Sequence, residues 1–160
     1  MTGSGAAFET LFRTEAGRLV RLAHLLGAED PEVVVQEAFC RLYDVRRHRE
    51  VGNPAAYLSR IVVNEVRTRR RRRILSDRKV LHLVTAAPAD EQVALSESIR
   101  GLLQALDHLA PRQREALVLR YWLDLPLLEI ADVMQVRVGT VKSLVSRGLA
   151  RLAAELEDHR

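Results

Sequence analysis

Apolar residues recur every three or four positions along most of this 160-residue chain, and proline or glycine interrupts the recurrence at short intervals. This period matches the turn of an α-helix, whereas a half-buried strand alternates apolar and polar residues. The first such segment runs from Phe8 to Leu26 and is followed by Gly27, a residue type that commonly ends helices. Aromatic residues, which are enriched in strands, make up only 4% of the chain. The pattern predicts an all-α fold.

Three residue pairs that end in proline mark the expected starts of later helices: Asp30-Pro31, Asn53-Pro54 and Ala110-Pro111. Asp and Asn side chains accept hydrogen bonds from the free N–H groups of a first helical turn, and proline is favoured at its first position. The expected buried face after the first pair is Val35, Phe39 and Leu42, with Ala38 and Tyr43 beside them. After the second pair it is Leu58, Ile61, Val62 and Val66. The helix that begins after Asn53 is expected to continue into the arginine run, Arg69–Arg73.

The helical period fades between Thr85 and Ser96, where alanine, proline and acidic residues are frequent. Such a break is typical of a linker. We therefore expect two small helical domains, residues 1–78 and 97–160, joined by a short linker over residues 79–96. The second domain resumes helical spacing with Ile99, Leu102, Leu103, Leu106 and Leu109.

The end of the chain has the layout of a helix-turn-helix. A helix from Arg112 to Trp122 is expected first, then a short helix over 127–134, three connecting residues, and a longer helix over 138–155. The longer helix begins with a polar face formed by Thr140, Lys142, Ser143, Ser146 and Arg147. Cations and hydroxyls on one face suit the major groove of DNA, although an ordinary packed helix pair with a solvated face has the same layout.

Positive charge is concentrated in one block of the sequence. The chain has a net charge of +4, yet residues 46–79 alone hold twelve basic and three acidic residues, a net charge of +9. A GC-rich genome would explain why arginine outnumbers lysine, but it does not explain why the basic residues gather. Clustered arginine indicates a polyanionic partner such as nucleic acid, with a localisation signal or a solvated tail as the alternatives.

The same block mixes cations with an aromatic ring and an amide. The residues are Arg47, His48, Arg49, Tyr57, Asn64 and Arg67. Such a set can follow a nucleic-acid backbone and hold an unstacked base. Core packing of Tyr57 and a surface amide at Asn64 are the alternatives.

Other classes of protein find little support in the sequence. No stretch is long and apolar enough to span a membrane, the first residues lack the pattern of an export signal, and Cys40 is a single cysteine, so a reducing, cytoplasmic location is expected. The 5 histidines are dispersed, and no cysteine pair, nucleophile motif or phosphate-binding glycine loop is present. We expect no enzyme activity, no catalytic residue, no metal and no cofactor, and a nuclease is the poorly supported alternative.

Four segments of the chain resemble a known family in their order and residues: 30–43, 53–64, 109–121 and 139–143. The first two are similar to the conserved second region of bacterial sigma-70 factors, including the segment that melts and reads the minus-ten promoter element. The last two are similar to the domain that reads the minus-thirty-five element. With two domains and no third between them, the chain resembles the short extracytoplasmic-function group, and its arginine run resembles actinobacterial members.

The resemblance implies a specificity subunit that binds core RNA polymerase, through its β′ clamp and β subunits, and promoter DNA. It assigns polymerase docking to Gln36, Glu37 and Arg41. It assigns the minus-ten element to Arg47, His48, Arg49, Tyr57, Asn64, Arg67, Arg70 and Arg71. It assigns the minus-thirty-five element to Arg120, Thr140, Lys142, Ser143, Ser146 and Arg147. An anti-sigma protein is a further expected partner, and a stand-alone helix-turn-helix regulator is the alternative.

The chain departs from the family pattern at several positions. Tyr57 stands where many relatives have tryptophan, and Pro126 stands where a serine cap is frequent. Leu144 and Leu149 occupy positions that are often basic, so the groove-reading helix is less cationic than usual.

Overall fold

The computed structural model describes residues 2–76 and 96–158, and these form helices without any strand. This confirms the predicted all-α fold. The chain divides into two compact units, Met1–Arg71 and Arg72–Arg160. The predicted domain boundary at residue 78 and nearly all of the predicted linker fall within residues 77–95, outside the described residues.

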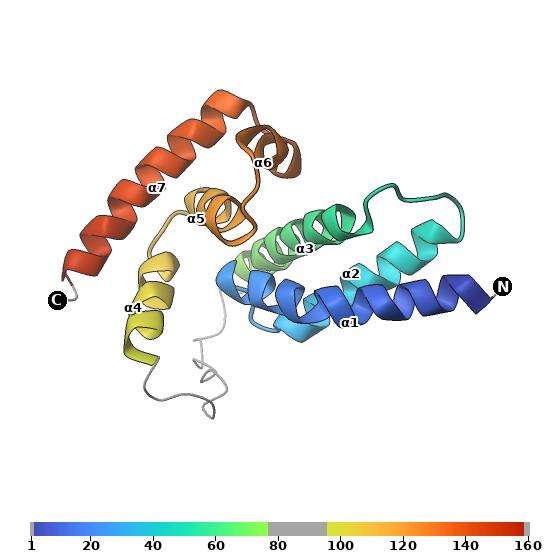
Figure 1. Ribbon diagram of the computed structural model, residues 1–160. Helices are drawn as coiled ribbons and strands as arrows, with labels where there is room; N and C mark the ends of the chain where they lie inside the picture. The colour runs from blue at the N-terminus through green and yellow to red at the C-terminus, as the bar shows by residue number, and fades with distance from the viewer. Residues whose placement is uncertain (1, 77–95, 159–160) are drawn as a thin grey trace. The chain divides into compact units, whose positions relative to one another are not determined.

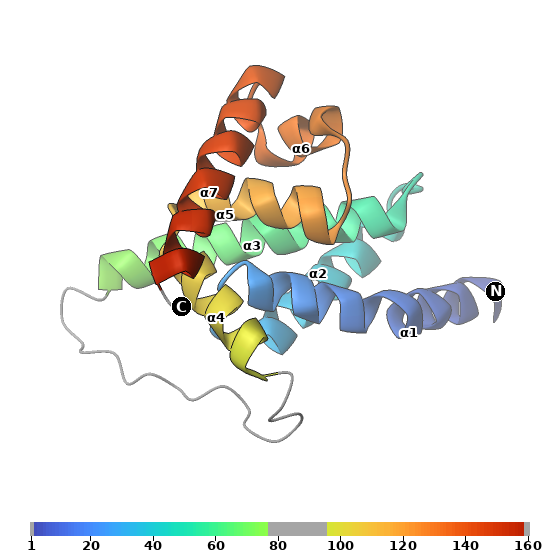
Figure 2. The same ribbon diagram turned by 60° about the vertical axis from the view of Figure 1, so that its left-hand side comes forward.

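The N-terminal unit contains α1 (Thr2–Leu25), α2 (Pro31–Arg46) and most of α3 (Pro54–Ser76). Figures 1 and 2 show α1 and α2 packed side by side. Helix α1 begins at Thr2, well before the predicted start at Phe8. The apolar pattern did not reveal this part of the helix, because Gly3, Gly5, Ala6 and Ala7 are exposed. Gly27, with φ of 91°, ends the helix as predicted, since this left-handed conformation favours glycine.

Most of the core of the N-terminal unit comes from the faces that the apolar spacing predicted, but Val34 and Val63 are buried as well, and Tyr43 is 55% exposed. The buried members of the core include Leu19, Leu22, Val35, Ala38, Phe39, Leu42, Leu58, Ile61, Val62 and Val66. Burying each large aliphatic side chain contributes about 1.5–3 kcal/mol. Phe8 and Phe12 extend this core, with ring centroids 5.9 Å and 4.9 Å from that of Phe39.

The two proline-marked helix starts differ in how they are capped. The Asn53 side-chain oxygen accepts a hydrogen bond from the Ala56 N–H at 3.2 Å, as the sequence predicted. Asp30 occupies the cap position of α2 but makes no side-chain capping bond, so that prediction was wrong. Its backbone, at φ −131° and ψ 79°, falls short of the extended conformation usual for a capping residue. Helix α3 continues through the arginine run to Ser76, as expected.

The C-terminal unit contains α4 (Ser96–Asp107), α5 (Pro111–Leu117), the π-helical turn η1 (Val118–Trp122), α6 (Leu127–Met134) and α7 (Val138–Asp158). The single helix expected from Arg112 to Trp122 is therefore a helix that widens into a π turn. One π turn over 5 residues is too short for its different period to show in the apolar spacing, so the sequence pattern did not reveal the change. Helix α7 packs against α4, α5 and α6.

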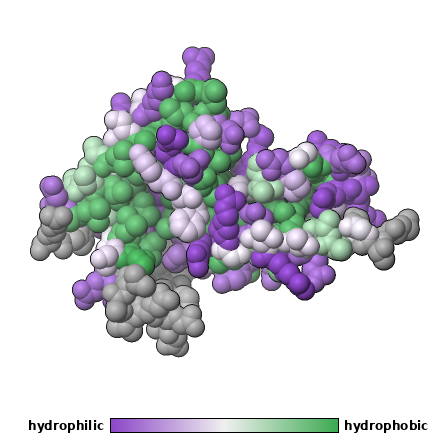
Figure 3. All heavy atoms as spheres, in the orientation of Figure 1, coloured by the Kyte–Doolittle hydropathy of each residue, from purple (hydrophilic) through white to green (hydrophobic). Residues whose placement is uncertain are grey.

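Close packing of α7 on α5 depends on Gly148. A methyl group placed there would lie 3.1 Å from Cγ and Cδ1 of Leu117, tighter than ordinary contact. At the other end of the unit, the apolar stripe of α4 is only partly covered. Ile99 and Leu102 are 48% and 37% exposed rather than buried, and Figure 3 shows hydrophobic surface over this helix and the adjoining part of α7.

Candidate functional site

One side of α3 carries the aromatic ring, the amide and several guanidinium groups predicted to bind a nucleic acid. Tyr57, Asn64, Arg67 and Arg71 are spaced seven, three and four positions apart, so they follow one face of the helix. All four side chains are at least partly exposed, and Arg70 lies next to them. With a rise of about 1.5 Å per residue, this stripe is about 21 Å long. It is long enough to follow several nucleotides of one strand.

The connection between α2 and α3 presents Arg47, His48 and Arg49, all exposed. This turn is held by backbone hydrogen bonds, in which the Arg47 N–H donates to Tyr43 and the N–H groups of His48 and Arg49 both donate to Val45, at 3.0–3.3 Å. A shallow hollow beside it is lined by Asp44, Val45, His48 and Arg49. The turn leads directly into the first turns of α3, which carry Tyr57.

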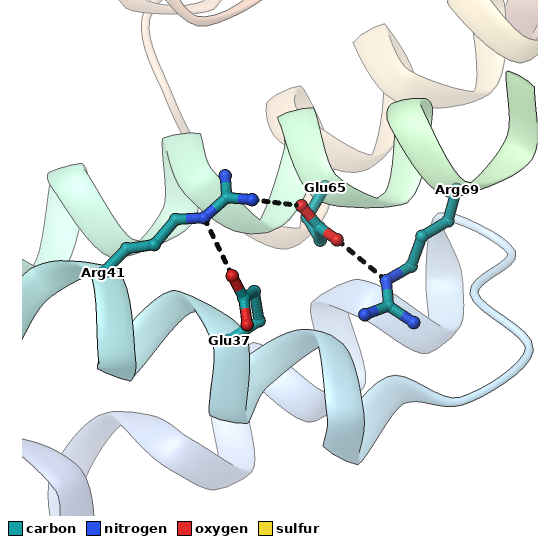
Figure 4. Close-up of polar contacts among 4 residues, drawn as sticks. All are labelled: Glu37, Arg41, Glu65 and Arg69. Atoms are coloured by element: carbon teal, nitrogen blue, oxygen red, sulfur yellow. Dashed lines mark hydrogen bonds and ion pairs between the residues drawn. The ribbon is translucent and has the colours of Figure 1, made fainter. Parts of the chain in front are cut away.

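The residues predicted to dock a protein partner lie on the outer side of α2. Gln36 and Arg41 are exposed and Glu37 is half-buried. Nε of Arg41 donates to a carboxylate oxygen of Glu37 at 3.1 Å, one turn away on the same helix (Figure 4). These residues therefore form one polar surface, although Arg41 is engaged by an acidic neighbour rather than standing alone.

Sequence reasoning missed Glu65, which joins this surface to α3. Its side chain is 6% exposed, and it accepts hydrogen bonds from Arg41 and Arg69, each at 2.9 Å. A signal was available, because Glu65 interrupts the apolar face that contains Ile61, Val62 and Val66. An acidic residue on a buried helix face requires a charged partner, and arginines from two helices supply one each.

The predicted groove-reading residues lie together on α7. Thr140, Lys142, Ser143, Ser146 and Arg147 are all exposed. On the opposite side, Val141 and Gly148 are buried. Thr140 lies in the first turn, where free N–H groups and the helix dipole favour an anion.

Two arginines fix the elements around the helix-turn-helix. The Arg120 guanidinium donates from Nη1 to the carbonyl of Leu125 at 2.9 Å and so closes the turn ahead of α6. Arg112 donates from Nη1 to the carbonyl of Met134 at 3.3 Å, which satisfies a carbonyl at the end of α6. Pro126 stands at the cap position of α6 without a side-chain bond. Arg120, predicted to touch DNA, is thus also a structural residue.

The connection between α6 and α7 is short, as predicted. It begins at Gln135, whose φ of 57° and ψ of 46° place it in the left-handed conformation that ends a helix. Its N–H and that of Val136 donate to carbonyls of α6. These hydrogen bonds define the short turn that connects the two helices.

Neither a metal site nor a membrane span is found in the parts described. Across residues 2–76 and 96–158, His, Cys, Asp and Glu side chains do not gather in threes as metal ligands do. No helix in these ranges combines the length and apolar content needed to cross a bilayer.

Comparison with known proteins matches both units to one family. Residues 11–74 match the model for Sigma-70 region 2, and residues 99–152 match the model for Sigma-70, region 4. The chain is 33% identical over 157 residues to the RNA polymerase sigma-E factor of Streptomyces coelicolor, covering 96% of this chain and 88% of that protein. It is 31% identical over 161 residues to the ECF RNA polymerase sigma factor SigM of Mycobacterium tuberculosis, covering 96% and 79%.

A solved structure shares the fold. The sigma factor RpoE of Bartonella quintana, in complex with the anti-sigma factor NepR, superposes with a TM-score of 0.78 at 27% identity and covers 96% of this chain and 99% of that one. The two region models, their order along the chain and the relatives agree with one another. The chain therefore belongs to the extracytoplasmic-function group of the sigma-70 family of RNA polymerase sigma factors.

Proposed function

We propose that this chain binds core RNA polymerase and directs it to promoters, with the N-terminal unit opening the minus-ten element and α7 reading the minus-thirty-five element. The proposal depends on one observation: this member of the family has both a cationic and aromatic stripe on α3 and a polar face on α7. A duplex reader alone needs only the second of these.

At the minus-ten element, the stripe on α3 would hold a separated strand. Tyr57 offers a ring on which a base can stack, and the Asn64 amide offers both a donor and an acceptor to a base edge. Arg67, Arg70 and Arg71 would neutralise phosphates along the same face. The turn Arg47–Arg49 and its hollow would receive a base that has left the stack.

At the minus-thirty-five element, α7 would enter the major groove with its N-terminal half. Lys142 and Arg147 can contact phosphate or guanine, and the hydroxyls of Ser143 and Ser146 can contact either kind of base. The N–H groups near Thr140 would bind a backbone phosphate. Arg120 would reach a phosphate with the donors that do not hold the Leu125 carbonyl.

Gln36, Glu37 and Arg41 would dock on the clamp of the β′ subunit. The structurally similar sigma factor of Bartonella quintana is bound by an anti-sigma factor in its solved structure. By extension, an anti-sigma factor would regulate this chain by covering the surfaces that polymerase uses.

Run-off transcription with core polymerase on a promoter library tests the proposal, together with pull-down of core polymerase. We expect the wild-type chain to bind core and to select start sites. A Gln36→Ala, Glu37→Lys double variant should lose binding, whereas Glu9→Lys, at an exposed position of α1, should bind normally. Equal pull-down by the double variant would remove these residues from the docking surface. A wild-type chain that binds duplex DNA without associating with core would instead be a stand-alone helix-turn-helix regulator.

A further inference from the structure

Glu65 links two arginines that come from different helices. Its Oε2 accepts a hydrogen bond from Nη2 of Arg41 on α2, and its Oε1 accepts one from Nε of Arg69 on α3, both at 2.9 Å. Nε of Arg41 donates to Glu37 at 3.1 Å. Figure 4 shows the resulting chain of four residues, Glu37, Arg41, Glu65 and Arg69, with Glu65 between the two guanidinium groups.

The exposures of these residues assign them different tasks. The Glu65 side chain is 6% exposed, too little to touch a large partner directly. The Arg41 side chain is 48% exposed, and its side-on edge, Nε and Nη2, is occupied by the two carboxylates. Among the described residues, Nη1, on the end-on edge, makes no hydrogen bond. A guanidinium held in this way loses little rotamer freedom when it binds a further group.

We propose that Glu65 is a positioning residue of the docking surface formed by Gln36, Glu37 and Arg41, an inference that rests on the proposed function. Glu65 aims the end-on edge of Arg41 outward, where its paired N–H groups fit a carboxylate of the polymerase. Arg69 fixes the second oxygen of Glu65 and so keeps the carboxylate in one orientation. Arg69 thereby supports protein docking although it belongs to the arginine run.

The test measures affinity for core polymerase in a double-mutant cycle. Glu65→Gln keeps the size of the side chain and removes its charge, and it should weaken binding about fivefold to tenfold, the net value of one typical hydrogen bond. In an Arg41→Gln background, Glu65→Gln should have no further effect, because Glu65 acts through Arg41. Glu9→Gln makes the same change of charge at an exposed position of α1 and should bind as the wild type does.

Thermal unfolding of each variant separates positioning from folding. The proposal would be overturned if Glu65→Gln bound core with wild-type affinity. It would also be overturned if Glu65→Gln weakened binding as much in the Arg41→Gln background as in the wild type. If Glu65→Gln unfolds, Arg69→Gln tests the proposal instead. It removes the second arginine that holds the Glu65 carboxylate, and the Arg69 side chain is half-exposed. We then expect about a twofold to threefold loss that disappears in the Arg41→Gln background, and an unchanged affinity would overturn the proposal. A wild-type chain that fails to bind core would instead refute the proposed function itself.

Discussion

The guanidinium of Arg114 donates from Nη1 to Oδ1 of Asp107 at 2.7 Å, and so ties α5 to the last residue of α4. The Arg114 side chain is 4% exposed, whereas that of Asp107 is 64% exposed. A charge with so little access to water depends on its charged partners. This ion pair therefore holds α4 against the remainder of the C-terminal unit.

Replacing Asp107 with asparagine should destabilise the C-terminal unit. We expect a loss of about 1–2 kcal/mol, less than for a fully buried pair, because Asp107 is itself exposed to solvent. Chemical denaturation followed by circular dichroism measures the change. Asp158→Asn, at the exposed end of α7, removes the same charge and should leave the stability unchanged. An equal loss in both variants would show that the contact with Arg114 is not the cause.

Replacing Arg70, Arg71 and Arg72 with glutamine should weaken promoter binding by the holoenzyme and flatten its dependence on salt. Each lost phosphate contact should reduce the slope of log K against log salt by about one. Fluorescence anisotropy at several salt concentrations gives the slope. A triple variant of Arg13, Arg18 and Arg21 on α1 removes the same charge and should keep the wild-type slope. If the first variant also keeps it, the arginine run is a solvated segment.

Replacing Arg147 with alanine should reduce discrimination between the correct and mutated minus-thirty-five elements by about 1–3 kcal/mol, the value of a good contact to a base. Competition binding with a set of single-base changes measures this effect. Arg151→Ala, one turn further along α7, serves as the control. A uniform loss over all sequences would place Arg147 on a phosphate, and no loss would remove it from the interface.

Glu155 should make stability depend on acid pH. Its carboxylate lies 2.9 Å from Nδ1 of His108. This hydrogen bond is the main cause that lowers the pKa of Glu155 below its ordinary 4.5, and the positive charges of His108 and Arg151 act in the same direction. Partial loss of hydration raises the pKa but does not cancel these effects. A lowered pKa in the folded state stabilises the fold above pH 4.5, and this stabilisation is lost as the pH falls through the lower value.

Thermal unfolding between pH 2.5 and 7 checks this expectation. The difference in melting temperature between the wild type and Glu155→Gln should be present above pH 4.5 and should shrink toward the acid end. Glu157→Gln, exposed on the same helix, should follow the wild-type profile. A parallel profile for Glu155→Gln would contradict the assignment of the contact.

Local patterns in the sequence were enough to predict most of the helices, the turn before α7 and the distribution of charge. These features depend on local chemistry: the apolar period of each helix, the Asn53 cap, Gly27 in its left-handed conformation, and the clustering of the arginine run. Local signals failed at Asp30, whose backbone conformation does not allow the predicted capping bond. They also failed before Phe8, where the helix continues through residues that carry no apolar pattern.

Which side chains from distant segments meet became visible from the packing of the helices. Arg41 and Glu65 are 24 positions apart and lie on different helices, so no spacing rule pairs them. Ile99 and Leu102 have the same apolar pattern as buried residues, yet they remain exposed. Burial and ion pairing depend on which neighbour stands opposite a side chain, and that is set by the packing of whole helices rather than by the period within one.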